Sequence, residues 1–467
     1  MWGLSRQDSL WRDEAATWQV AQRSTAEIWH MVGNVDVVHG CYYLLMHVLF
    51  ECFGPSTTTL RLPSVLATGV AAACVAVIGH RLAGARAGFA GGMTFGLLPA
   101  VQFYLQEGRP YALVAAGAGI CTLLLVSVLH RRVRTPYWPY WAAYGSTILL
   151  MGLLNWLSLM ILPAHLAILL WTRAGREIWT RWTTASAAAT ACVLPLILFS
   201  RGQSAQVSWI PPLSWHMMIG PAVLLAIGGV GTLLDRPQAG RLSVAAVGLP
   251  LLAVPQIGLV ALSLSRPLFL DRYILYSLLG LALLIGAAID SAVQAVTPRL
   301  PRASKWVLPA VVAAAMVALL PQSLAKRSPA SRVDDVLAIA SDVRRAKETG
   351  SAVLFIPAAR RDTKTVSPSA FAGLRDIALV ESPEQSGTLK GVEASPDHIR
   401  AAMLAQQRIL LVTDATRAAK PVTAERDKVK TAVLKKYFTP VADEQVRGRR
   451  ATVYERLASA HDRRGRS

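Results

Sequence analysis

The chain has 467 residues, of which 53% are hydrophobic and only 16% charged, yet its formal net charge is +20. Ordinary soluble domains have about 25% charged residues, so this composition argues against a wholly soluble protein. Of the 48 Lys and Arg residues, 27 lie after Pro321, which makes the first 320 residues mostly apolar and the last 145 basic. Beside a membrane, a basic segment indicates attraction to anionic lipid headgroups or an acidic polymer more simply than to nucleic acid. We expect no nucleic-acid partner.

The sequence starts with MWGL, four residues before a polar loop. A chain whose first loop lies outside the membrane usually has an earlier helix that delivers it there. We interpret MWGL as the tail of such a helix, and we expect the upstream genomic sequence to encode about 20 apolar residues in frame.

A first polar cluster follows at residues 11–18, where Asp13 and Glu14 stand between Trp11 and Trp18. Tryptophan anchors at the membrane interface, and a carboxylate at that depth can act as a general base on an acceptor hydroxyl. The alternative is structural: Asp13 or Thr17 caps the start of a helix.

The apolar stretch 38–53 is not predicted to cross the bilayer, because a crossing there would reverse every later loop. It carries a polar stripe at i, i+4 spacing. We expect an interfacial or re-entrant helix on the outer side. The stripe consists of His39, Tyr43, His47 and Glu51.

Ten later stretches are long and apolar enough to cross a bilayer. They lie near 60–80, 87–104, 109–130, 137–153, 154–172, 183–200, 217–234, 242–264, 272–292 and 305–322.

The loops between these stretches alternate in charge. One set contains thirteen cations, and the intervening set holds only Arg109, Arg201, Arg266 and Arg272. Positively charged loops stay in the cytoplasm, so the poorly charged set and everything after residue 322 are predicted to lie outside.

Two more polar clusters lie on the predicted outer side. Glu107, Arg109 and Tyr111 surround Pro110 between two spans, where a proline is also typical of a helix start. Later, Arg272 and Tyr273 open a span. Arginine binds phosphate through a planar fork of donors; a pairing of Glu107 with Arg109, or an interfacial anchor at 272–273, is the structural alternative.

After Ser323 the pattern indicates a soluble α/β domain with a partly parallel sheet. Helical periodicity at 333–349 and 396–407 alternates with apolar runs that predict strands. The strand candidates are 351–357, 377–382 and 409–414, and a closing hairpin pairs 437–446 with 451–457 across RGRR. The predicted domains are therefore an outer loop with an interfacial helix (1–59), a transmembrane domain of about ten helices (60–322) and an extracytoplasmic α/β domain (323–467).

Together the clusters resemble the GT-C glycosyltransferase superfamily, in particular bacterial polyprenyl-phosphate-sugar-dependent protein mannosyltransferases and lipid A aminoarabinose transferases. The resemblance covers most of the chain and depends on the order and placement of the motifs. Gly40-Cys41 departs from the pattern, because the family usually has prolines there. The motifs are Asp13-Glu14, Asp36-Val-Val-His39, Tyr42-Tyr43-Leu-Leu-Met-His47, Phe53-Gly54, Leu60-Arg61-Leu-Pro63-Ser64, Arg109-Pro110-Tyr111 and Arg272-Tyr273.

The resemblance implies a polytopic enzyme of the bacterial plasma membrane that moves a sugar, mannose or a related hexose, from a polyprenyl-phosphate carrier. Inverting transfer to a protein, lipid or glycan acceptor would take place on the outer face. Asp13 is the expected base with Glu14 next, and Arg109, Arg272 and Tyr273 would bind the donor phosphate, because a phosphate leaving group needs cations rather than a general acid. The expected substrate-binding residues are Asp36, His39, Glu107, Tyr111 and Trp209.

Most members of this branch need no metal, although His39, His47 and Glu51 could hold a divalent ion; we expect none. Two other classes stay open. A transporter should place its binding residues near the bilayer midplane, whereas these motifs gather at one face. A non-catalytic assembly factor for cell-envelope glycans would not need Asp13, Arg109 and Arg272 together.

Overall fold

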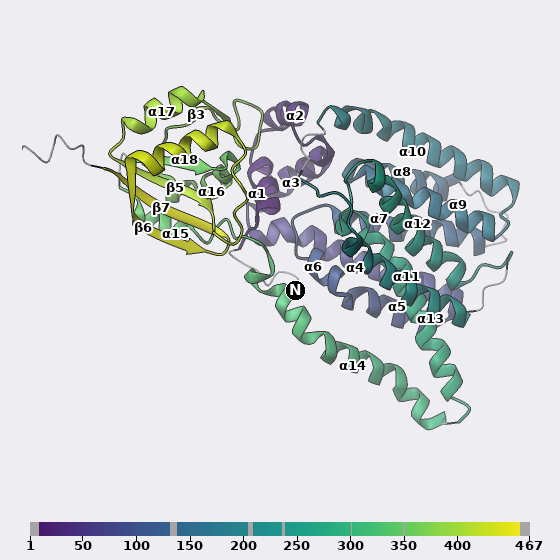
Figure 1. The fold of residues 1–467 in the computed structure, drawn as a ribbon. Coiled ribbons are helices and arrows are strands. Elements are labelled where there is room, and N and C mark those ends of the chain that lie inside the picture. Colours follow the sequence, from purple (N-terminus) through teal and green to yellow (C-terminus); the bar gives the residue numbers. More distant parts are fainter. Residues whose placement is uncertain are drawn as a thin grey trace, which may run out of the picture. The chain divides into compact units, whose positions relative to one another are not determined.

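The computed structural model describes residues 9–130, 138–203, 209–235, 239–299, 301–348 and 351–457. The MWGL segment lies outside these residues. The described chain forms two compact units (Figure 1). The first unit contains 36–42 and 61–327, and the second contains 9–35, 43–60 and 328–457.

Seven described helices are long and apolar enough to cross a membrane, and each coincides with a predicted span. The chain is thus a polytopic helical protein with a C-terminal strand-containing domain, as expected. The seven are α4 (Thr57–Ala83), α7 (Tyr111–His130), α10 (Arg176–Gly202), α11 (Trp215–Asp235), α12 (Val244–Ser265), η5 with α13 (Asp271–Ser277 and Leu278–Val296) and α14 (Pro301–Arg327).

The other three predicted spans are shorter or interrupted helices. Stretch 87–104 is divided into α5 (Ala85–Leu97) and α6 (Pro99–Tyr104), because a residue before proline avoids the α conformation and Leu98 is extended, with ψ 130°. The stretch 137–153 is the 17-residue α8 (Trp138–Leu154). Stretch 154–172 begins with η3 (Trp156–Met160), capped by Asn155, and only then continues as α9 (Ile161–Trp171).

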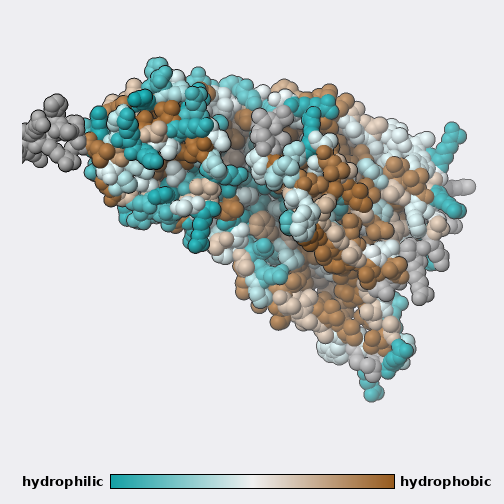
Figure 2. All heavy atoms as spheres, in the orientation of Figure 1, coloured by the Kyte–Doolittle hydropathy of each residue, from teal (hydrophilic) through white to brown (hydrophobic). Residues whose placement is uncertain are grey.

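Glycines allow the helices of the first unit to approach closely. A Cβ at Gly286 of α13 would lie 2.6 Å from the backbone of Ala87 and Gly91 in α5, and a Cβ at Gly280 would lie 2.3 Å from the carbonyl of Gly248 in α12. Small residues at such contacts are typical of helix packing in membranes. The unit also exposes large apolar side chains, among them Leu198, Val230, Leu264 and Val317, and Figure 2 shows apolar atoms covering much of the visible face of these helices. Such an apolar helical surface is suited to contact with the lipid chains of a membrane.

The predicted interfacial stretch is helical. It consists of η2 (Val37–His39) and α3 (Gly40–Phe53), and it is not among the seven long helices. Gly40 lies where η2 passes into α3, with helical φ/ψ. Tyr43 of the polar stripe is buried and Glu51 is exposed. Its position at the membrane surface stays a prediction.

The second unit contains a five-stranded mixed sheet in the order β2-β1-β5-β7-β6. Strands β2, β1 and β5 are parallel, and β7 and β6 are antiparallel, which confirms the predicted α/β domain. The strands are β1 (Ala352–Ile356), β2 (Arg375–Asp376), β5 (Arg408–Asp414), β6 (Phe438–Val446) and β7 (Arg449–Arg456).

Apolar side chains alternate between the two faces of this sheet. Val353, Phe355 and Val412 pack in one core with α15 (Ala340–Ala346) and η8 (Pro368–Phe371). Leu354 and Leu411 pack in another with α17 (Pro396–Leu404) and α18 (Glu425–Tyr437). The sheet is therefore covered on both sides, as parallel strands require.

Several predictions for this domain need correction. The helix expected at 333–349 is only α15 plus turns, and the strand at 377–382 is β3 (Leu379–Glu381), which pairs with β4 (Val392–Glu393) in a separate sheet. Helix α18 was not predicted, because its sequence is mostly polar. The closing hairpin is confirmed, and its turn has positive φ at Arg447 (43°) and Gly448 (83°). The remaining short elements are η6 (Pro329–Ser331), η7 (Ala358–Arg361) and α16 (Asp362–Val366).

The N-terminal helices α1 (Arg12–Ala21) and α2 (Thr25–Asn34) belong to the second unit. Neither Asp13 nor Thr17 caps α1: Trp11 is its N-cap residue, and both Asp13 and Glu14 lie in the first turn. Carboxylates in that turn are favoured by the helix dipole.

Candidate functional site

A hydrogen-bonded chain of three side chains lies at the start of η2 in the first unit. Arg109 Nη2 lies 3.0 Å from His39 Nε2, and His39 Nδ1 lies 2.7 Å from Asp36 Oδ1. A guanidinium can only donate, so Nε2 accepts and the proton sits on Nδ1, which donates to Asp36. Burial, and next the charge of Arg109, lower the pKa of His39. His39 is thus a neutral imidazole of defined tautomer.

The backbone fixes both ends of this chain. Asp36 adopts the left-handed conformation, with φ 60°, and the next amide, that of Val37, donates to Gln203 Oε1 over 2.9 Å. On the other side, Ser64 Oγ donates to the carbonyls of Glu107 (2.6 Å) and Arg109 (3.2 Å). The loop that carries Arg109 is therefore held against α4.

Aromatic rings surround the guanidinium of Arg272. Its Cζ lies 5.6 Å from the ring centroid of Tyr111, 5.5 Å from that of Trp209 and 5.8 Å from that of Tyr273. Cation–π attraction acts within about 6 Å, so the three rings hold the charge in place. The charge of Arg272 also lowers the pKa of His39, less than burial and Arg109 do, while Asp36 raises it.

Asp271 organises the backbone that carries Arg272. Its Oδ1 accepts a hydrogen bond from Tyr104 Oη (2.9 Å) and another from the amide of Arg272 (2.9 Å). The ring of Tyr104 in turn packs edge-on against Tyr111, with centroids 5.9 Å apart. The start of η5 is thus tied to α6 and α7.

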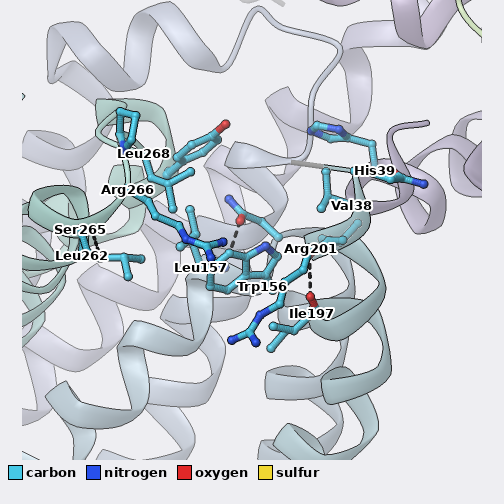
Figure 3. Close-up of a pocket in the computed structure, with 16 residues that line it drawn as sticks. Val38, His39, Trp156, Leu157, Ile197, Arg201, Leu262, Ser265, Arg266 and Leu268 are labelled. Carbon is cyan, nitrogen blue, oxygen red and sulfur yellow. Dashed lines mark hydrogen bonds between the residues drawn. The ribbon is translucent and has the colours of Figure 1, made fainter. Parts of the chain in front are cut away.

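A cavity of about 710 Å³ lies beside these residues and shares His39 and Tyr273 with them (Figure 3). Two more cations line it: Arg201, at the end of α10, and Arg266, just after α12. Neither makes an ion pair in the part of the chain that the structure describes. Figure 3 shows both side chains extending toward the part of the cavity where Trp156 lies. The full lining is Val38, His39, Leu154, Asn155, Trp156, Leu157, Ile197, Ser200, Arg201, Gln203, Leu262, Ser265, Arg266, Pro267, Leu268 and Tyr273.

The structure therefore gathers most of the predicted site residues in the first unit. Arg201 and Arg266 line the cavity, while Arg109 and Arg272 act on His39 at its edge. These four are the cations of the poorly charged loop set. The predicted residues brought together with them are Asp36, His39, Tyr111, Trp209 and Tyr273, whereas Glu107 is buried in the neighbouring loop and does not line the cavity.

Asp13 and Glu14 lie in the second unit, on the first turn of α1. Asp13 is partly exposed, whereas Glu14 is fully buried. The segment before them is tied to the α/β domain: the amide of Leu10 donates to Asp335 Oδ1 (3.3 Å), and that of Arg12 donates to Asp334 Oδ1 (3.2 Å). The first turn of α1, which carries Asp13 and Glu14 and is called the carboxylate turn below, is thus positioned by the C-terminal domain.

Sequence reasoning missed the residues that form most of the cavity wall. In the sequence, Arg201 and Arg266 indicate only which loops lie on which membrane face, although a lone arginine at the end of an apolar run is a usable signal for a site. Trp156, Asn155 and Gln203 carried no pattern of their own. Their role depends on how α8, α10 and α12 pack.

Among the described residues, no group of three or more His, Cys, Asp or Glu side chains could hold a metal ion. Two members of the stripe considered for a metal make other contacts. His39 bonds to Asp36 and Arg109, and His47 Nδ1 lies 3.0 Å from the carbonyl of Ala21.

No protein-family model matches the sequence, and no curated protein matches it. Solved structures do. The crystal structure of ArnT from Cupriavidus metallidurans in the apo state superposes with a TM-score of 0.60 at 13% identity, covering 97% of this chain and 95% of that one. The chain has the ArnT fold. The same protein bound to undecaprenyl phosphate gives a TM-score of 0.57 at 13% identity over the same shares.

ArnT is an aminoarabinose transferase of the GT-C superfamily, so the ArnT fold confirms the fold expected from the resemblance. The oligosaccharyltransferase AglB from Archaeoglobus fulgidus is less similar. It superposes with a TM-score of 0.48 at 12% identity, over 96% of this chain and 70% of AglB. The ArnT fold accounts for nearly the whole length of the chain, including the α/β domain.

Proposed function

We propose that this protein is a membrane glycosyltransferase that takes a sugar from a polyprenyl-phosphate carrier and transfers it to an acceptor with inversion. One observation carries the proposal, in a chain with the ArnT fold. Two cations of the poorly charged loops, Arg201 and Arg266, line one cavity, and the other two, Arg109 and Arg272, act on His39, which lines the same cavity. ArnT itself has been solved with undecaprenyl phosphate, which supports a lipid phosphate as the ligand.

The proposed donor site uses these cations for the phosphate. Arg201 and Arg266 supply two guanidinium groups, which suit phosphate oxygens because their donors form a planar fork. Arg272, held by aromatic rings, and Arg109 add positive charge at the edge of the cavity. The bond that breaks leaves a phosphate anion, and fixed cations stabilise that charge without a general acid.

His39 has a distinct part in this proposal. As a neutral acceptor for Arg109, it orients the guanidinium without cancelling its charge. The Asp36 carboxylate keeps the imidazole in the required tautomer. Tyr111 and Trp209, whose rings face Arg272, are proposed to contact the sugar. Glu107, which is fully buried in the neighbouring loop, is left out of this contact.

The acceptor is activated by a carboxylate in the proposed mechanism. Asp13 takes the proton of the acceptor hydroxyl, the oxygen attacks the anomeric carbon, and the carbon–phosphate oxygen bond breaks to release polyprenyl phosphate. Asp13 is favoured over Glu14 because it is partly exposed while Glu14 is fully buried. Such a displacement resembles glycoside cleavage in its oxocarbenium-like transition state.

We further propose that the enzyme lies in a bacterial plasma membrane with the α/β domain on the outer side, and that the sugar is mannose or a related hexose. The alternating loop charges support the orientation. The resemblance of the motifs supports the sugar.

A transfer assay tests the function directly. The purified full-length protein is incubated with radiolabelled polyprenyl-phosphate mannose, glucose or aminoarabinose and a membrane extract as the acceptor source. We expect label to move from one donor to an extractable product, with release of polyprenyl phosphate. If no donor is consumed, while the protein binds polyprenyl phosphate, an assembly or transport role replaces the enzymatic one.

A further inference from the structure

The α/β domain contains a second cavity, of about 690 Å³, that the proposed donor site does not use. It opens at the carboxyl ends of two neighbouring parallel strands. Its wall includes Ile356, the last residue of β1, and Pro357, which follows it. Thr413 and Asp414, the last two residues of β5, also line the wall. Residues 418–424 and helix α18 also line it.

The position of this cleft follows from the strand order. After β1 the chain crosses to β2 on one side, and it returns later to β5 on the other side of β1. The order therefore reverses between β1 and β5. In open α/β sheets, ligands bind in the crevice outside the carboxyl ends of the strands at such a switch point.

The cleft has an excess of positive charge. Five cations line it, namely Arg12, Arg360, Lys420, Lys435 and Arg450, against the two carboxylates Asp414 and Asp427.

Three of these cations are already paired. Arg12 Nε lies 3.5 Å from Asp334 Oδ2. Arg360 makes a two-pronged pair with Asp414, at 2.5 and 2.9 Å, and Arg450 makes another with Asp443, at 2.6 and 3.0 Å. Lys420 and Lys435 are exposed and form no ion pair among the described residues. These two ammonium groups remain for an anionic ligand.

The rest of the wall combines apolar and hydroxyl groups. Leu411, Leu434 and Phe438 contribute buried apolar side chains to the wall. Threonine residues 413, 423 and 431 also line the cleft. A saccharide offers an apolar C–H face together with many hydroxyls, so it suits both surfaces. An acidic group on it would be bound by the lysines.

We propose that this cleft binds an anionic saccharide. Its wall includes Arg12, the residue directly before Asp13. This step rests on the proposed function: the bound saccharide is the acceptor, or part of it, and the cleft delivers it beside the Asp13 carboxylate that activates it. The C-terminal domain then selects the acceptor, whereas the first unit holds the donor.

Binding to the full-length protein in lipid nanodiscs tests this proposal. The probes are tetragalacturonate, the neutral maltotetraose and inorganic phosphate, measured by calorimetry. The test variant is the double substitution Lys420→Glu and Lys435→Glu. The matched control is Lys428→Glu, an exposed lysine on the same helix as Lys435 that does not line the cleft.

We expect tetragalacturonate to bind at least tenfold more tightly than either maltotetraose or phosphate. The double variant should lose tenfold or more of that affinity, and the Lys428→Glu variant should match the wild type. Absence of tetragalacturonate binding, equal binding of maltotetraose or phosphate, or no effect of the double substitution would each overturn the proposal.

The same preparation separates this proposal from the proposed function. Donor consumption without tetragalacturonate binding would contradict the saccharide site in the cleft and support the transferase function. Tetragalacturonate binding that depends on Lys420 and Lys435, without consumption of any donor, would support the saccharide site in the cleft and contradict the transferase function.

Discussion

Arg109 donates a hydrogen bond of 3.0 Å to Nε2 of His39, a residue 70 positions earlier in the chain. This contact makes His39 an acceptor, so its pKa lies below the ordinary value, through burial and the Arg109 charge. The consequence is a dependence of stability on pH.

Above an unfolded-state pKa of about 6.5, His39 is neutral in both the folded and the unfolded chain and does not lower the free energy of unfolding. Below it, the unfolded chain binds a proton that the folded chain resists, so stability falls as the pH drops through about 6.5, by at most about 1.4 kcal/mol per pH unit. His39→Gln should remove this part of the acid sensitivity. Thermal unfolding of the detergent-purified protein between pH 5 and 8 measures it, with the exposed His398→Gln as the control. Equal pH profiles for wild type and His39→Gln would contradict the assignment.

Asp334 is expected to hold the carboxylate turn in place. Its buried side chain accepts from the amide of Arg12 (3.2 Å) and pairs with Arg449 (3.2 Å). Asp334→Asn should cost about 1–3 kcal/mol, the range for leaving a buried hydrogen-bonding group without its partner. It should also speed hydrogen exchange at the start of α1.

Asp443→Asn is the control for that experiment, because its pair with Arg450 is well exposed. Such pairs contribute about 0–1 kcal/mol. If both variants exchange at the wild-type rate over residues 10–21, Asp334 does not position the turn.

The cavity cations are expected to set donor affinity. Replacing both Arg201 and Arg266 by Ala removes two charged donors, each of which contributes about 1.5–3 kcal/mol in a hydrogen bond. Affinity for polyprenyl phosphate should therefore fall by at least about tenfold. The control variant Arg299→Ala, at an exposed arginine beyond α13, should bind polyprenyl phosphate like the wild type. If the double variant also binds with unchanged affinity, Arg201 and Arg266 do not form the phosphate site.

The proposed orientation predicts that alkaline phosphatase is active when fused after Ser328, directly beyond the end of α14 at Arg327. A fusion after Arg299 should be inactive, since that loop belongs to the cation-rich set. Reversed activities would place the α/β domain in the cytoplasm and the cavity on the wrong face for an extracytoplasmic reaction.

The long helices and the α/β domain could be predicted from the sequence because their signals are local. Apolar runs of about 20 residues mark the spans, and short apolar runs mark β1 and β5. The errors arise where a local signal is weak or interrupted. Pro99 ends α5 inside an apolar run, and α18 buries only a narrow apolar stripe, so its composition looks like a loop.

The site was harder to predict, since its contacts join distant parts of the chain. The arginines at 109 and 272 stood out as charges beside apolar runs. Arg201 and Arg266 gave the same signal, but only the packing of α10 against its neighbours shows that they face one cavity. The contact between Arg109 and His39 depends on a left-handed turn at Asp36 that no residue preference announces, because aspartate adopts it only occasionally.

The role of Asp13 is the central claim about the chemistry, and single-turnover transfer by the Asp13→Asn variant tests it most directly. The substitution keeps the size of the side chain and removes its ability to accept the proton. We expect turnover to fall by about 10²–10⁴-fold, the usual range for a positioned acid or base, while separately measured binding of the donor lipid stays near the wild-type value. Wild-type turnover in Asp13→Asn would remove Asp13 as the base, and wild-type turnover in Glu14→Gln as well would contradict the glycosyltransferase mechanism proposed for this chain.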